Sequence, residues 1–216
     1  MQGFLPYQTY FFLQEQSNID NNMVDRASKV LRSLEKMAQK EFVPSIGPTK
    51  GKIITEIIKK YNPKTVLEIG TLYGYSAILM ANILPVGGKV VTIELDKLIA
   101  ATARKNIADA GLSDKIDIVD GNALEAIPKL DLKYDLLFLD AAKDEYLKYL
   151  KLAENNKNLK KGSIVVADNV EVSKNEMLDY LEYVRSSGIY KSETIETTLE
   201  FTPNVRDAIE VSIKVT

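Results

Sequence analysis

Residues 66–76 read VLEIGTLYGYS, in which an apolar run leads through a glycine-rich turn into the start of a helical pattern. Further apolar runs follow along the chain, and helical patterns separate them. This alternation, with apolar side chains on both faces of each strand, predicts a parallel sheet covered by helices on both sides. We expect strands at 65–69, 89–95, 116–119, 134–139 and 163–167, and helices near 76–83, 97–110, 123–130, 145–156 and 174–187.

The two ends of the chain depart from this alternation. From Met23 to Ala38, apolar residues recur at helical spacing, and a second helix is expected after the break PSIGP at 44–48, with Thr49 as its cap. Residues 190–196 and 208–215 are expected to form two strands with no helix between them. The 216 residues therefore predict one α/β domain with extra amino-terminal helices and a terminal hairpin added to the sheet.

The composition excludes several kinds of chemistry. The chain has no histidine, cysteine or tryptophan, so it cannot form a Ser-His-Asp triad, a Cys-His pair or a zinc site of His and Cys. Its 28 basic and 30 acidic residues give a net charge of −2, which argues against a dedicated nucleic-acid binder. No apolar run approaches the roughly 20 residues of a membrane span, and the amino end lacks a basic signal region, so we expect a cytoplasmic protein.

Ligands of an open α/β sheet bind beyond the carboxyl ends of its strands. The turn at 70–74 has the spacing G-x-x-x-G, unlike the dinucleotide fingerprint, and Glu68 just before it would repel a phosphate but suit a cationic ligand. At the end of the second strand, Glu94 is placed to accept hydrogen bonds from both hydroxyls of a ribose, and Asp96 could cap the next helix. The Asp-Gly-Asn of 120–122 is either an ordinary turn or a contact to an adenine edge.

Two further strands each end in an acid. Asp140 follows the fourth strand in FLDAAK, and Asp168 with Asn169 follows the fifth in VVADN. Two carboxylates buried together without a cation would cost several kcal/mol or force protonation. A divalent cation removes this cost, and three oxygen donors leave about three octahedral positions of Mg²⁺ for water or substrate oxygens. The alternative is that both acids cap the helices that follow them.

Taken together, these motifs resemble a known family. EIGTLYGYSA at 68–77, TIELD at 92–96, FLDAAKDEY at 138–146 and VVADNV at 165–170 are similar to the cation-dependent class I O-methyltransferases of the catechol and caffeoyl-CoA type, which use S-adenosylmethionine (SAM). The similarity runs from about Phe42 to the end and includes PSIGPTKG at 44–51. It implies a Rossmann-like, seven-stranded, mostly parallel sheet with an antiparallel last strand. It also implies a single methyltransferase domain over 1–216, with an arm and helix at 1–41 and a SAM-dependent core at 42–216.

The resemblance implies roles for individual residues. The residues implied to bind SAM are Glu68, Gly70, Tyr73 and Ser76 at the methionine and sulfonium end, Glu94 at the ribose, and Asn122, Ala123 and Ala141 at the adenine. The residues implied to bind Mg²⁺, or another divalent cation such as Mn²⁺ or Ca²⁺, are Asp140, Asp168 and Asn169. Asp140 and Lys143 would be catalytic, and Glu200 would contact a substrate hydroxyl. Ala141 and Ala142 stand where the catechol enzymes usually carry His and Trp, so the substrate stays open.

The expected reaction is methyl transfer from SAM to a hydroxyl of a catechol-like vicinal diol that the cation chelates. Coordination lowers the pKa of that hydroxyl, and Lys143 would either accept its proton or stabilise the oxyanion. Two alternatives stay open: a hydroxylated tRNA base, for which Lys157, Lys160 and Lys161 offer a basic cluster, and a SAM-binding protein without catalysis. We expect a homodimer without a membrane partner, in which the aromatic residues of segment 4–12 form a lid, a dimer contact or an arm packed on its own domain.

Overall fold

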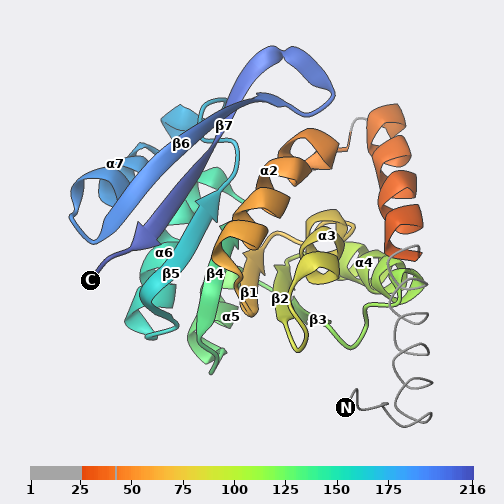
Figure 1. The fold of residues 1–216 in the computed structure, drawn as a ribbon, viewed down its shortest axis with the longest axis horizontal. Coiled ribbons are helices and arrows are strands. Elements are labelled where there is room, and N and C mark those ends of the chain that lie inside the picture. Colours follow the sequence, from red (N-terminus) through yellow and green to blue (C-terminus); the bar gives the residue numbers. More distant parts are fainter. Residues whose placement is uncertain (1–25, 42) are drawn as a thin grey trace, which may run out of the picture.

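A seven-stranded sheet in the order β3-β2-β1-β4-β5-β7-β6 organises the molecule (Figure 1). The computed structural model describes residues 26–41 and 43–216. Its strands are β1 Thr65–Ile69, β2 Lys89–Glu94, β3 Ile116–Asp120, β4 Tyr134–Leu139, β5 Leu159–Ala167, β6 Tyr190–Leu199 and β7 Thr202–Lys214. The first five strands run parallel to one another, whereas β7 is antiparallel to both β5 and β6. The predicted sheet with its terminal hairpin is therefore confirmed.

Helices cover both faces of this sheet. One face packs against the helix of residues 26–41 and against α2 Gly47–Tyr61, α3 Tyr75–Ile83 and α4 Lys97–Ala110. The other face packs against α5 Ala123–Ala126, α6 Tyr146–Asn155 and α7 Leu178–Ser186, with short 3₁₀ turns at η1 Ile127–Lys129, η2 Lys143–Glu145 and η3 Lys174–Glu176. Alternate residues of one strand enter the two cores, as Phe138 and Leu139 of β4 do. Covering on both faces explains why the strands read as continuous apolar runs.

The start of α2 differs from the sequence-based expectation. The helix begins at Gly47 rather than after Thr49, and Ile46 at its N-cap position offers no capping side chain. The carboxylate of Glu200, in the turn between β6 and β7, accepts the backbone N–H of Thr49 at 3.1 Å and that of Lys50 at 3.4 Å. The prediction of Thr49 as the cap was wrong because the capping group comes from about 150 residues further along the chain.

The terminal hairpin is longer than expected. Residues 210–213 of β7 pair with β5, but the pairing of β7 with β6 continues to Thr202 and Leu199. The two strands therefore leave the sheet as a ribbon that passes the amino end of α2 (Figure 1). This ribbon brings Glu200 to α2, which a prediction of two short strands did not anticipate.

Hydrogen bonds from the first residue and from the middle of the helix of residues 26–41 fasten it to α4 and α3. Arg26 donates hydrogen bonds to the last carbonyls of α4, 2.9 Å from Ala108 O and 3.0 Å from Asp109 O. Glu35 accepts a hydrogen bond of 2.7 Å from the hydroxyl of Tyr75 in α3. Met23, the aromatic residues of segment 4–12 and Phe42 lie outside the described residues. Within the described ranges, no helix combines the length and the apolar character that crossing a membrane requires.

Candidate functional site

The carboxyl ends of β2, β1, β4 and β5 lie side by side and bring their polar residues together. Backbone hydrogen bonds continue one residue past the strands, from Gly70 N to Ile93 O at 3.1 Å, from Asp140 N to Ile69 O at 3.0 Å and from Asp168 N to Leu139 O at 3.0 Å. The strand order reverses between β1 and β4, and such a switch point is where open α/β sheets bind ligands. The residues after these strands therefore face one common space.

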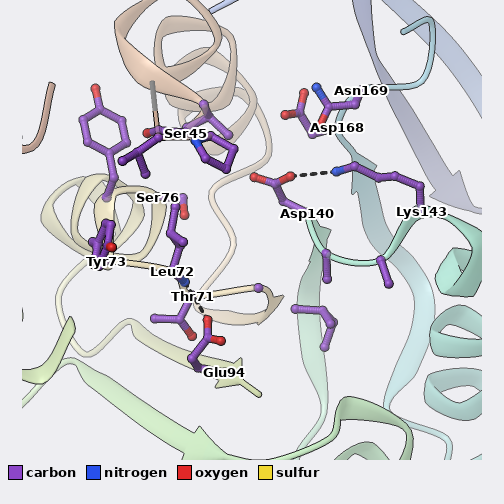
Figure 2. A pocket seen from close by; sticks show the side chains of 18 of the residues that line it. Ser45, Thr71, Leu72, Tyr73, Ser76, Glu94, Asp140, Lys143, Asp168 and Asn169 are labelled. Carbon is purple, nitrogen blue, oxygen red and sulfur yellow. Dashed lines mark hydrogen bonds and ion pairs between the residues drawn. The ribbon is translucent and has the colours of Figure 1, made fainter. Parts of the chain in front are cut away.

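A cavity of about 800 Å³ lies beyond these strand ends. It is lined by every site residue that the sequence predicted except Glu68, namely Gly70, Tyr73, Ser76, Glu94, Asn122, Ala123, Asp140, Ala141, Lys143, Asp168, Asn169 and Glu200. Leu34 and Met37 from the helix of residues 26–41, together with Ile46, add an apolar wall. Figure 2 shows Glu94 and Leu72 in one part of the cavity and Asp140, Asp168 and Asn169 in another. The volume suits a nucleoside-sized ligand together with a small second molecule.

The turn after β1 is shaped by a close approach of two backbones. Gly70 has φ +100°, and a Cβ atom at this position would lie 2.1 Å from the carbonyl oxygen of Asp140, so only glycine fits. The turn is also tied to β2, because Leu72 N donates to Glu94 Oε2 at 2.8 Å. The other oxygen, Glu94 Oε1, accepts from Asp96 N at 3.0 Å, while Asp96 itself caps α4. Asp96 is thus the cap, and Glu94 remains at the cavity wall.

Glu68 lies behind this turn and is completely buried. Neither of its carboxylate oxygens has a hydrogen-bond partner among the described residues. Burial raises the pKa of Glu68 to about 8, and the negative charges of Asp140 and Glu94 add to this rise. The hydroxyls of Ser76 and Thr92 oppose part of it, although neither makes a hydrogen bond of good geometry. An unpartnered buried carboxyl group is costly, so this position is built to receive a donor.

Beyond β3, Asn122 serves the fold as well as the cavity. Its side-chain oxygen accepts a hydrogen bond of 2.8 Å from Leu124 N and so caps the short helix α5. Asn122 and the buried Ala123 both line the cavity. The turn is therefore ordinary capping chemistry at a position that also faces the ligand space, and the two readings of the sequence are compatible.

Lys143 is held in place rather than solvated. Its Nζ atom donates to Asp140 Oδ1 at 2.9 Å and to the hydroxyl of Tyr146 at 2.8 Å, and its side chain is 15% exposed. Tyr146, the first residue of α6, is fully buried, and its hydroxyl donates in turn to the carbonyl of Asp168 at 3.4 Å. Lys143 and Asp140 therefore form a connected polar pair on the cavity wall (Figure 2), and the buried Tyr146 supports Lys143 from behind.

A buried lysine completes the acidic end of the cavity. Lys50 Nζ in α2 lies 2.7 Å from Asp168 Oδ1 and 2.6 Å from Asp207 Oδ2 in β7. Burial and the neighbouring Asp140 raise the pKa of Asp168 to about 6. Although burial opposes it, the pKa of Asp207 is lowered by its hydrogen bond from Lys50. Lys50 thus stabilises the negative charge of Asp207 more than that of Asp168. The Asp168 carboxylate would be stabilised further by another positive charge nearby.

The cluster as a whole suits an oxygen-bound cation. Three carboxylates (Asp140, Asp168 and Asp207) against two ammonium groups (Lys50 and Lys143) leave a charge of 2 − 3 = −1. Asp168 Oδ1 is paired with Lys50 Nζ at 2.7 Å but accepts no hydrogen bond of good geometry from the described residues. No group of three His, Cys, Asp or Glu side chains arranged for a metal occurs in the described part of the chain. The donor set here is instead two carboxylates and the Asn169 amide, which is typical of hard cations.

Sequence reasoning missed Lys50 and Asp207. Lys50 stood within the quoted PSIGPTKG motif without a role, yet its spacing from Ile54, Ile57 and Ile58 places it on the buried face of α2. A lysine on an apolar helix face needs a buried acid as its partner, so the position of Lys50 among these isoleucines could have identified it as a site residue. Asp207 carries no comparable signal, because β7 was expected to begin only at residue 208.

The sheet order and the cavity at its switch point define the class as a Rossmann-like methyltransferase, to judge by solved structures. An O-methyltransferase from Bacillus cereus in complex with SAH is 26% identical, with a TM-score of 0.75 over 88% of this chain and 90% of that one. The O-methyltransferase TomG from Streptomyces achromogenes, at 24% identity and a TM-score of 0.76, covers 87% of this chain and 90% of its own and supports the fold alone.

Sequence comparison narrows the class to a family. A sequence profile described as O-methyltransferase matches residues 20–178. Catechol O-methyltransferase B of Danio rerio is 39% identical over 179 residues, which are 81% of this chain and 67% of that protein. Catechol O-methyltransferase of Sus scrofa is 35% identical over 179 residues, 81% of this chain and 95% of that protein. The chain belongs to the O-methyltransferase family and is a SAM-dependent methyltransferase.

Proposed function

We propose that this protein transfers the methyl group of SAM to one hydroxyl of a small aromatic vicinal diol, which a divalent cation holds at Asp140, Asp168 and Asn169. The observation that carries the proposal is the sharing of one cavity by a hard-cation donor set, a held lysine and a nucleoside-sized space. The similarity to catechol O-methyltransferases supports the diol as the acceptor. We assign this activity to a single domain whose SAM-dependent core spans residues 42–216.

The residues around the β1 and β2 ends fit SAM. The buried Glu68 carboxyl group, which has no hydrogen-bond partner among the described residues, suits a cationic amino group. Glu94 at the tip of β2 suits the ribose hydroxyls, as an acid does at this position in nucleotide-binding sheets. We assign Gly70, Tyr73 and Ser76 to the methionine end and Asn122, Ala123 and Ala141 to the adenine. The SAH complex of the Bacillus cereus relative supports this use of the cavity.

The chemistry of the donor set supports the cation. Asp140 and Asp168 bring carboxylate oxygens and Asn169 an amide oxygen, and the surrounding cluster carries one uncompensated negative charge. Oxygen ligands of this kind suit Mg²⁺, with Mn²⁺ or Ca²⁺ as substitutes. The two hydroxyls of a vicinal diol would complete the coordination, which explains why a diol rather than a monophenol is the expected acceptor.

The protein's own contribution to the reaction is positioning, exclusion of water and the handling of one proton. When bound, SAM supplies an electrophilic methyl group, and the cation makes a bound hydroxyl more acidic. Lys143, which Asp140 and Tyr146 hold in place, would either accept the proton of that hydroxyl or, in its charged form, stabilise the oxygen anion. The apolar wall of Leu34, Met37 and Ile46 limits water, which favours a step in which opposite charges cancel.

The basic cluster that could suit tRNA lies away from the cavity. Lys160 and Lys161 stand near the amino end of β5, whereas the cavity opens beyond its carboxyl end at Asp168. Leu159 pairs with Tyr134 at the start of β4, whereas Ala167 pairs with Leu139 at its end, so the length of β4 separates the two places. Lys160 is also paired with Asp135 at 2.8 Å. These positions favour a small molecule over tRNA as the acceptor.

A methyl-transfer assay with a panel of acceptors tests the proposal. The panel contains catechol, caffeoyl-CoA, the monophenol guaiacol and undermodified tRNA, each with SAM and Mg²⁺. We expect transfer to a vicinal diol and none to guaiacol or tRNA. Salt-dependent transfer to tRNA alone would replace the small-molecule acceptor, and tight SAM binding without transfer to any diol would indicate a binding protein without catalysis.

A further inference from the structure

Lys50 is an unusual residue for the first turn of a helix, because its charged end is buried. Its side chain is 1% exposed, and its Nζ atom contacts Asp168 from β5 and Asp207 from β7. A buried ammonium group is tolerated only when it is paired and hydrogen-bonded. The lysine, which itself lines the cavity, therefore joins α2 to β7 and to the residue after β5 at the acidic end of the cavity.

Asp207 accepts hydrogen bonds from two other groups besides Lys50. Its Oδ2 atom accepts from Lys50 Nζ at 2.6 Å and from Asn169 Nδ2 at 2.9 Å, and its Oδ1 atom accepts from Val172 N at 3.2 Å. Both carboxylate oxygens are thereby used. Asp207 itself is not among the residues that line the cavity, so its contacts act through Lys50 and Asn169.

We propose that Lys50 and Asp207 form a positioning pair that holds Asp168 and Asn169 in the arrangement that binds the divalent cation. This inference rests on the proposed function. Asp207 takes the amide nitrogen of Asn169, which leaves the amide oxygen for the cation. An amide turned the other way would present two donors to a positive ion. On the opposite side, Lys50 fixes the Asp168 carboxylate.

The backbone of Asn169 adds a reason for this support. Asn169 has φ +61°, a left-handed conformation that asparagine tolerates better than most residues but that still requires local hydrogen bonding. Asp207 provides this hydrogen bonding, because its carboxylate accepts from Asn169 Nδ2 and from Val172 N. Outer contacts of this kind orient the ligands of metal sites, and their loss typically weakens metal affinity by 10- to 100-fold.

Binding of Mn²⁺ alone, followed by electron paramagnetic resonance of the free ion, tests the pair without any turnover. Asp207→Asn removes the charge, whereas Asp207→Glu keeps the charge but moves the carboxylate by one methylene group. The matched control is Glu210→Gln on the same strand: Glu210 is also buried, and it pairs with Arg185 at 2.8 Å away from the cavity. We expect both Asp207 variants to bind Mn²⁺ at least tenfold more weakly, with SAM affinity within twofold, and Glu210→Gln to bind Mn²⁺ like the wild type.

A second readout separates positioning from general damage. For the Asp207 variants, the Mg²⁺ concentration at half-maximal activity should rise about tenfold, and turnover at saturating Mg²⁺ should recover. Mn²⁺ affinity within twofold of the wild type in both Asp207 variants would overturn the inference, as would normal affinity in Asp207→Glu alone, because charge and not position would then matter. A wild type that binds Mn²⁺ no better than its Asp168→Asn variant would instead remove the proposed cation site, and the inference with it.

Discussion

Glu68 provides a prediction in which stability and cofactor affinity change in opposite directions. The substitution Glu68→Gln keeps the shape of the side chain and removes its ionisation. Because burial raises the pKa of Glu68 to about 8 from an ordinary value of 4.5, the folded protein binds a proton that the unfolded chain releases. The contribution of this group to stability is therefore complete below pH 4.5 and is lost as the pH rises through 8.

The size of this effect follows from the same two values. At about 1.4 kcal/mol per pH unit, ionisation of Glu68 costs the folded protein about 5 kcal/mol once the pH is well above 8. Between pH 6 and 8 the loss is about 2 kcal/mol, and Asp168, whose pKa is raised to about 6, adds little in this range. The free energy of unfolding of the wild type should therefore fall by these 2 kcal/mol from pH 6 to pH 8, whereas that of Glu68→Gln should stay constant. The variant should then be the more stable protein at pH 8.

Urea unfolding of the protein without SAM, at pH 6 and pH 8, measures this difference. Glu56→Gln is the matched control, because Glu56 is exposed on α2 and should leave the pH dependence unchanged. Calorimetry with SAM should show that Glu68→Gln binds at least tenfold more weakly, since the proposed site for the cationic end of SAM loses the carboxyl group that lies behind its turn. The reasoning is refuted if the variant keeps the pH dependence of the wild type, or if it binds SAM equally well.

Three further predictions concern single residues. Gly70 has φ +100°, and Gly70→Ala places a methyl group against the Asp140 carbonyl. The variant should lose about 2 kcal/mol of stability in urea unfolding and should not bind SAM, and unchanged stability would contradict the close approach. Asp96→Ala removes the cap of α4 and should cost about 1 kcal/mol while SAM affinity stays within twofold, and a large loss of SAM affinity would give Asp96 a role in the site. Lys143→Met should lower kcat by about 10²- to 10⁴-fold with little change in SAM affinity, and a normal kcat in steady-state kinetics would exclude Lys143 from the reaction.

The parallel part of the fold could be predicted because its signals are local. Apolar runs such as 134–139 and the helical patterns between them need no knowledge of distant residues, and the order of motifs along the chain matched a family whose sheet is known. The ribbon of β6 and β7 could not be placed in the same way. Its length depends on pairing between two strands beyond the sheet, and its contact with α2 through Glu200 joins residues about 150 positions apart.

The candidate site shows the same division. Residues such as Glu94, Asp140 and Asp168 were predictable because they follow strands whose carboxyl ends must meet at one edge of the sheet. Lys50 and Asp207 were missed because they act from a helix face and from an antiparallel strand, where no position in the sequence pattern points to the ligand space. Sequence reasoning thus finds the residues that can touch a ligand more readily than those that hold them.

Removal and return of Mg²⁺ show whether methyl transfer depends on a cation bound at Asp140, Asp168 and Asn169. Purified protein is incubated with labelled SAM and a vicinal diol, first with Mg²⁺, then with excess EDTA, and finally with Mg²⁺ restored, beside an Asp168→Asn variant. We expect transfer with Mg²⁺, its loss in EDTA, its return when Mg²⁺ is restored, and no transfer by the variant. Transfer to the diol that continues undiminished in EDTA would contradict it.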